Sequence, residues 1–244
     1  MPLPKIETPK YELTIPSTGK LVKFRPFLVR EEKVLLIAME SDDERQMINA
    51  VQDIIKNCVY EDFDTKLIPL FDIEYIFLQL RAKSKGEKVD LTANCEKCEN
   101  PIEFTIDLST IDVKGIKEHN NKIKLSDDIG VVLKYPSIDL QERVGGDMSS
   151  IENIFETIAV SVDSIWDKES VYSAKDHTRD EVKDFLESLP DTAFDKIREF
   201  FDTLPVLKHE VPLECKHKIG KGKNAKMCNW KSTKTLEGLG SFFE

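Results

Sequence analysis

Short stretches of alternating apolar and polar residues predict β-hairpins in this chain. The segment YELTIPSTGKLVKFRPF alternates in this way on both sides of a PSTGK turn. A second hairpin is predicted for KIKLSDDIGVVLKYP, and the same alternation flanks the cysteines of LTANCEKCENP. The segment that begins HEVPLEC is also expected to run as strand, loop and strand. Turn residues such as Pro, Gly, Asn and Asp separate the two halves of each hairpin.

Apolar residues three and four positions apart predict helices between these hairpins. A long helical region is expected from about residue 30 to residue 58, with a break near SDDE at 41–44. Cys58 lies on its apolar face, so we expect a buried packing thiol. Another helix is predicted at about 70–83. In the C-terminal half, helices are expected in SSIENIFETIAVSVDSIW, in HTRDEVKDFLESLP with its T-x-x-E capping box, and in DTAFDKIREFFDTLP.

These elements predict an α+β protein with a helical core, several β-hairpins and a split zinc-ribbon-like module built from two cysteine-bearing hairpins. We divide the chain into an N-terminal hairpin with helices at 1–86 and a second hairpin with a helical region at 111–204. Residues 87–110 and 205–244 would together form the split module. All three parts can also form one compact unit.

Composition narrows the classes of partner. The 244 residues carry a net charge of −10, which argues against broad electrostatic binding to nucleic acid. Eight lysines between Lys208 and Lys234 form a local exception. No apolar run has the roughly 18 residues of a membrane span, and the first residues lack a signal-peptide pattern. We therefore expect a cytoplasmic protein without a membrane partner.

Two pairs of cysteines are the strongest chemical signal. Cys95 and Cys98 have C-x2-C spacing, and Cys215 and Cys228 are separated by twelve residues. Four thiolates suit zinc, which prefers tetrahedral sulfur coordination in structural sites. Because such a site leaves no open position for water or substrate, a zinc ion here would be structural and would be coupled to folding.

Alternatives to this four-cysteine site stay open at this stage. His217 can replace one cysteine ligand, or the four thiols can be unligated. A redox role for Cys95 and Cys98 is disfavoured because the motif lies between strands rather than at a helix N-terminus, with Glu96 and Glu99 nearby.

The sequence offers no positive case for an enzyme. It contains no nucleotide-binding glycine loop, no H-E-x-x-H and no G-x-S-x-G motif. The four histidines are scattered in polar stretches. The C-terminal end is apolar, and we expect this end to dock on a protein surface. Its candidate partner-binding residues are Leu236, Leu239, Phe242 and Phe243.

Several segments resemble a family of baseplate hub proteins from T-even-type contractile-tailed phages. The resemblance covers the opening run LPKIETPKYELTIPSTGKLVKFRPFLVREEKVLLIAMES and the LTANCEKCENPIEFTIDL segment. It continues in FLESLPDTAFDKIREFFDTLPVLKHEVPLEC and in the closing LEGLGSFF. It implies a hub component or hub-assembly factor that binds other baseplate hub proteins in the host cytoplasm during tail assembly, and that can remain in the virion tail. It implies no catalysis.

Two other functions compete with this interpretation. A zinc-ribbon nucleic-acid-binding adaptor would use the lysine-rich loop between Cys215 and Cys228, although the net charge opposes it. A thiol oxidoreductase would use Cys95 and Cys98.

Overall fold

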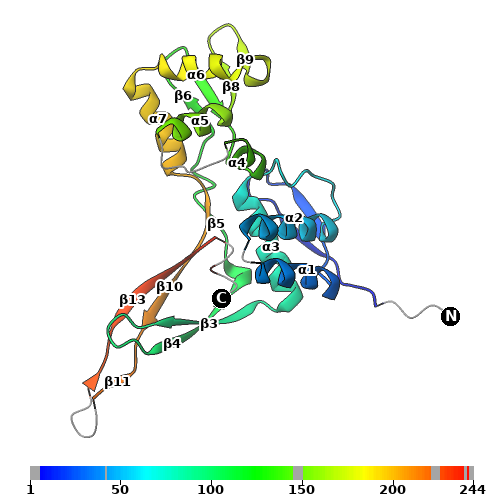
Figure 1. Cartoon of the computed structure of the whole chain (residues 1–244), viewed down its shortest axis with the longest axis vertical. Coiled ribbons are helices and arrows are strands. Elements are labelled where there is room, and N and C mark those ends of the chain that lie inside the picture. Colours follow the sequence, from blue (N-terminus) through cyan, green and yellow to red (C-terminus); the bar gives the residue numbers. More distant parts are fainter. Residues whose placement is uncertain (1–5, 42, 145–150, 221–225, 239–240, 242–244) are drawn as a thin grey trace, which may run out of the picture. The chain divides into compact units, whose positions relative to one another are not determined.

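The computed structural model describes residues 6–41, 43–144, 151–220, 226–238 and 241 (Figure 1). Helices and small antiparallel sheets alternate along the described chain, which confirms the α+β class. The chain divides into two compact units: residues 1–62, 74–114 and 206–244 form unit 1, and residues 63–73 and 115–205 form unit 2. None of the helices in the described ranges has the length and apolar character of a membrane span.

Unit 1 begins with the predicted hairpin and its helices. The elements are β1 (Tyr11–Thr14), β2 (Leu21–Phe24), α1 (Val29–Glu40), α2 (Glu44–Cys58) and α3 (Leu70–Lys85), the last of which starts in unit 2. The break between α1 and α2 falls at the predicted SDDE. Cys58 is buried at the end of α2, as predicted, and its carbonyl accepts a hydrogen bond from the backbone N–H of Arg25. The hairpin is thereby joined to the helices.

The rest of unit 1 consists of hairpins. Its elements are β3 (Lys88–Asn94), β4 (Pro101–Asp107), a 3-10 turn (Leu108–Thr110), β5 (Val113–Lys114), β10 (Val206–Glu214), β11 (Lys218–Ile219), β12 (Lys226–Met227) and β13 (Lys231–Glu237). The strand pair β3–β4 stands as a two-stranded sheet, whereas β10 lies between β13 and β5. Both long hairpins end at the cysteines that the sequence singled out.

Unit 2 combines helices with a four-stranded sheet. Its elements are β6 (Lys122–Lys124), β7 (Gly130–Leu133), α4 (Ile138–Val144), α5 (Ile151–Ser161), β8 (Val162–Trp166), β9 (Val171–Ser173), a 3-10 turn (Ala174–Asp176), α6 (Arg179–Glu187) and α7 (Asp191–Asp202). The sheet order is β6-β7-β8-β9. Helices α5, α6 and α7 pack against this sheet, and α4 contacts α5. The core joins Val131 and Leu133 of the sheet to Leu186 of α6 and Ile197 of α7. Thr178 and Glu181 form the predicted capping box at the start of α6.

One helix prediction was wrong in its second half. The apolar residues Val162 and Ile165 were assigned to a long helix, but α5 ends at Ser161 and these residues form β8. Val162 lies opposite Leu133, and Ile165 lies opposite Val131. Pairing with β7 therefore determines the conformation of this segment, and the local spacing does not.

Glu74 of α3 lies near Glu237 at the end of β13. Burial, together with the nearby Glu237 carboxylate, raises the pKa of Glu74 to about 7. An unfolded glutamate ionises near pH 4.3. The native state therefore retains a proton that the unfolded state has lost, and the contribution of Glu74 to stability falls as pH rises from about 4.5 to about 7.

We predict that Glu74→Gln changes the pH dependence of stability in this window. The free energies of unfolding of the two proteins should be similar at pH 5, and the variant should be more stable by roughly 1–3 kcal/mol at pH 8. Urea unfolding at a series of pH values measures this difference. Glu237→Gln, which removes only the neighbouring charge, should give a smaller gain. Parallel pH profiles for wild type and Glu74→Gln would contradict the prediction.

Candidate metal centre

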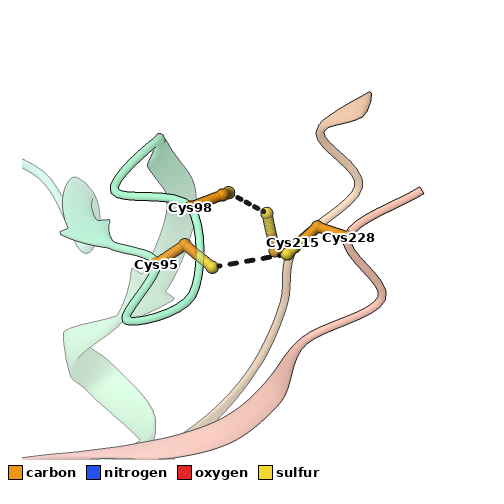
Figure 2. A group of neighbouring side chains, drawn as sticks. All are labelled: Cys95, Cys98, Cys215 and Cys228. Carbon is orange, nitrogen blue, oxygen red and sulfur yellow. Dashed lines mark hydrogen bonds between the residues drawn. The ribbon is translucent and has the colours of Figure 1, made fainter. Parts of the chain in front are cut away.

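Four cysteine side chains from two separate hairpins point toward one another (Figure 2). Cys95 and Cys98 lie in the turn between β3 and β4. Cys215 follows β10, and Cys228 precedes β13. The four sulfur atoms all lie within 4.8 Å of one another. The two cysteine pairs, more than a hundred residues apart in the sequence, are thus brought together as the sequence predicts.

The sulfur spacing fits a metal ion better than it fits disulfides. The Sγ atoms of Cys95 and Cys228 are 3.7 Å apart, and those of Cys98 and Cys215 are 3.6 Å apart. A disulfide requires about 2.05 Å. A tetrahedral ion with metal–sulfur bonds of about 2.3 Å holds its ligands about 3.8 Å apart. The cluster can therefore bind a metal ion with little movement of its side chains.

The two cysteine pairs lie in two separate backbone turns that have the same hydrogen bond and the same left-handed residue. The N–H of Cys95 donates to the carbonyl of Asn100, two residues past the second cysteine. In the other half, the N–H of Cys215 donates to the carbonyl of Trp230, which is also two residues past the second cysteine. The residue directly after each second cysteine has a left-handed backbone, with φ of 57° at Glu99 and 49° at Asn229.

The twelve-residue spacing of the second pair is therefore a C-x2-C turn with an insertion. The N–H of Cys228 donates to the carbonyl of His217, which brings these two residues together across residues 218–227. The inserted residues form their own hairpin, in which Lys218 pairs with Met227 and Ile219 with Lys226. Without them the sequence would read CKHCNW, beside CEKCEN in the first pair.

The surroundings shield the cluster and connect its two halves. Cys95, Cys215 and Cys228 are each at most 2% exposed. Ile102 and Trp230 pack against them. The Nζ of Lys97 donates to the carbonyl of Cys228 at 3.2 Å, and this bond links the first turn to the second. Three of the four thiols are thus shielded from water, whereas Cys98 is partly exposed.

The fold and the cysteine geometry can be compared with known proteins. Residues 8–244 match the family described as T4 bacteriophage base plate protein. The chain belongs to this phage baseplate family. The search of curated proteins and the search of solved structures gave no match. The match includes both units and all four cysteines, so the candidate metal centre is part of a baseplate protein.

The thiols of the baseplate protein differ in acidity. Hydrogen bonds from the side chain and backbone of Asn100 lower the pKa of Cys98 to about 6. At Cys215, a backbone hydrogen bond from His217 lowers the pKa, but burial and the neighbouring thiols outweigh it and raise the pKa to about 12. The hydrogen bonds from Asn100 thus favour the thiolate form of Cys98 over that of Cys215.

The sequence also singled out His217, the apolar C-terminal end and the lysine-rich stretch as candidate sites. His217 is exposed and lies outside the four-sulfur cluster. Leu236 is buried in β13, whereas Leu239, Phe242 and Phe243 lie outside the described residues. Two lysines of the basic stretch make ion pairs within unit 1, Lys208 with Glu210 and Lys231 with Glu214. These pairs reduce the positive charge available to a nucleic acid.

Sequence reasoning missed the residues that complete the two turns. Asn100 was not singled out, although it donates to the carbonyl of Cys98 and lowers the pKa of that thiol. Asn229 was also missed. Asparagine tolerates a left-handed backbone better than most residues, so an asparagine directly after the second cysteine was the available signal.

We predict that deletion of residues 218–227, which joins His217 to Cys228, leaves the metal centre intact. The deletion restores a C-x2-C turn, and shortening an exposed loop changes the free energy of unfolding by no more than about 1 kcal/mol. Metal content and urea unfolding of the purified variant measure both effects.

A matched deletion provides the control. Removing residues 216–227 joins Cys215 directly to Cys228, so the turn cannot form and the metal should be lost. Loss of metal from the shorter deletion as well would show that the hairpin is an essential part of the turn and would contradict the prediction.

Proposed function

We propose that the protein is a component or assembly factor of the phage baseplate hub, and that it acts by binding other hub proteins in the host cytoplasm during tail assembly. The observation that carries this proposal is the family match over residues 8–244, which includes both units. The opening run and the closing LEGLGSFF resemble hub proteins, and this resemblance supports the assignment to the hub in particular.

Three of the strongly shifted pKa values have a structural explanation. Burial raises the pKa of Cys58 to about 11, which makes this thiol a poor nucleophile. Glu74 owes its raised pKa to burial and to Glu237 at the end of β13. The acidic thiol of Cys98 faces other cysteines. Packing or a metal site accounts for each of these groups, so we infer a protein without a chemical reaction.

We further infer that the four cysteines bind one zinc ion. Thiolates are soft ligands, and zinc is the usual ion in tetrahedral four-cysteine sites. Cys95, Cys98, Cys215 and Cys228 would supply all four ligands, which leaves no open coordination position. The ion would then hold structure and would not activate a water molecule.

Zinc would add to the support that the β3–β4 hairpin receives from its buried residues Leu91 and Ile106. A two-stranded hairpin alone is only marginally stable in water, and β3–β4 stands as such a sheet. The ion would join this hairpin to the β10–β13 hairpin through the ends of both. It would also fix the start of β13 and thereby position the C-terminal end.

The zinc assignment predicts that the purified protein contains one zinc ion per chain. Cys215→Ser should lose the ion and several kcal/mol of stability, because metal binding and folding of such a site are coupled. Elemental analysis and thermal unfolding measure these two quantities. Cys58→Ala, which alters a buried thiol outside the cluster, should keep its zinc even if its stability falls.

A protein that contains no metal and whose four thiols react freely with a thiol reagent would refute the zinc assignment. The hub assignment would survive that result, because it depends on the family and not on the ion.

The hub assignment predicts binding to another hub protein. Co-expressed with the other baseplate proteins of its phage, the full-length protein should co-purify with at least one hub protein. A chain that ends at Gly238 retains the buried Leu236 but lacks Leu239, Phe242 and Phe243. It should fold and bind zinc normally, yet lose the hub protein.

If the truncated chain bound the hub protein as well as the full-length chain does, the C-terminal end would not be the contact. Failure of the full-length protein to bind any hub protein would overturn the hub assignment. Salt-sensitive binding to DNA or RNA instead would favour the zinc-ribbon adaptor.

A further inference from the structure

Helix α1 exposes an unusual number of apolar side chains. Of the sixteen large hydrophobic residues exposed among the described residues, six lie between residues 28 and 39: Leu28, Val29, Val34, Leu36, Ile37 and Met39. Val29 is 80% exposed, and Leu36 and Ile37 are each more than half exposed. Scattered apolar residues on a surface are ordinary, but such a concentration on one helix marks an interaction surface.

The buried side of α1 fixes which side faces outward. Leu35 and Ala38 are buried against the unit. Glu31 is also buried, and its carboxylate accepts hydrogen bonds from Arg25, Arg30 and the N–H of Leu28. Glu32 on the flank pairs with Lys85 of α3. These contacts hold the helix against rotation about its own axis.

The opposite side presents two charges around two apolar residues. With 3.6 residues per turn, Val29, Lys33, Leu36, Ile37 and Glu40 fall within an arc of roughly 100°, which we call the outer face of α1. Lys33 and Glu40 are both exposed. They are seven positions apart, about 10 Å along the helix and too far for an ion pair within it. The midpoint between them falls between Leu36 and Ile37.

This arrangement is complementary to itself. We propose that the outer face of α1 binds the same face of a second copy of the chain, with the two helices antiparallel about a two-fold axis between Leu36 and Ile37. Lys33 of each copy then lies beside Glu40 of the other. Leu36 packs on its own counterpart, and so does Ile37, so that all the contacts obey the symmetry of an isologous dimer.

The charges select the antiparallel orientation. If the two helices were parallel, Lys33 would face Lys33 and Glu40 would face Glu40, and both contacts would be repulsive. The apolar residues alone do not choose between the two orientations. A single helix contact buries less than the roughly 1,600 Å² of a standard interface, so the dimer should dissociate in the micromolar range.

Charge reversal provides a sharp test. Lys33→Glu and Glu40→Lys each turn two attractive pairs into repulsive ones and should each weaken the dimer by about tenfold. The double variant Lys33→Glu/Glu40→Lys re-forms both pairs with reversed sign and should return to within about threefold of wild type. Sedimentation equilibrium of the full chain over a range of concentrations at low salt measures all four dissociation constants.

Two further variants separate this face from other surfaces. Leu36→Glu places a charge at the centre of the contact and should leave only monomer. Ile154→Glu on α5, which replaces another exposed isoleucine, should dimerise as wild type does. Because these positions are exposed, all variants should keep the wild-type circular dichroism spectrum, and that measurement verifies folding.

A cysteine placed beside the axis tests the geometry directly. Since Ile37 would face its own counterpart, mild oxidation of Ile37→Cys should give a covalently linked dimer, whereas Ile154→Cys should give no covalent dimer. A wild-type protein that is monomeric at every concentration, or that binds only a different protein through this face, would overturn the proposal. So would a double charge variant as weak as the two single ones.

Discussion

The meeting of four cysteine sulfurs is the constraint on which the architecture of unit 1 depends. The sulfurs lie within 4.8 Å of one another although they come from the middle and the end of the chain. The two-stranded β3–β4 sheet meets the three-stranded β13-β10-β5 sheet there. The start of β13 is fixed by the same contact, and β13 in turn places Glu237 near Glu74 of α3. Strand β13 therefore runs from the cysteine cluster to the neighbourhood of α3.

Local patterns were sufficient for most of the secondary structure. Alternation predicted β1–β2 and β3–β4, and apolar spacing predicted α2, α6 and α7, because those signals depend on neighbours in the sequence. The helix prediction for residues 162–166 was wrong because pairing with a neighbouring strand determines their conformation. The meeting of the four cysteines was predicted from their residue type and from their occurrence in two pairs. The equivalence of the two turns was not, because it requires the hydrogen bond between Cys228 and His217.

The two turns also explain why the sequence signal looked irregular. A spacing of twelve residues is unlike a metal-binding turn, but the backbone closes around Cys215 and Cys228 as it does around Cys95 and Cys98. The described ends of the extra segment pair with each other as β11 and β12. The outer face of α1 includes none of the four cluster cysteines, so the dimer proposed for it does not depend on a bound ion.

The measurement that tests the account most directly is X-ray absorption at the zinc edge of the purified full-length protein. The account predicts a first shell of four sulfur atoms at about 2.3 Å, with no nitrogen or oxygen. A shell of three sulfurs and one nitrogen at about 2.0 Å would show a histidine ligand such as His217. Absence of a zinc edge would contradict the central claim, and packing alone would then have to hold the two hairpins together.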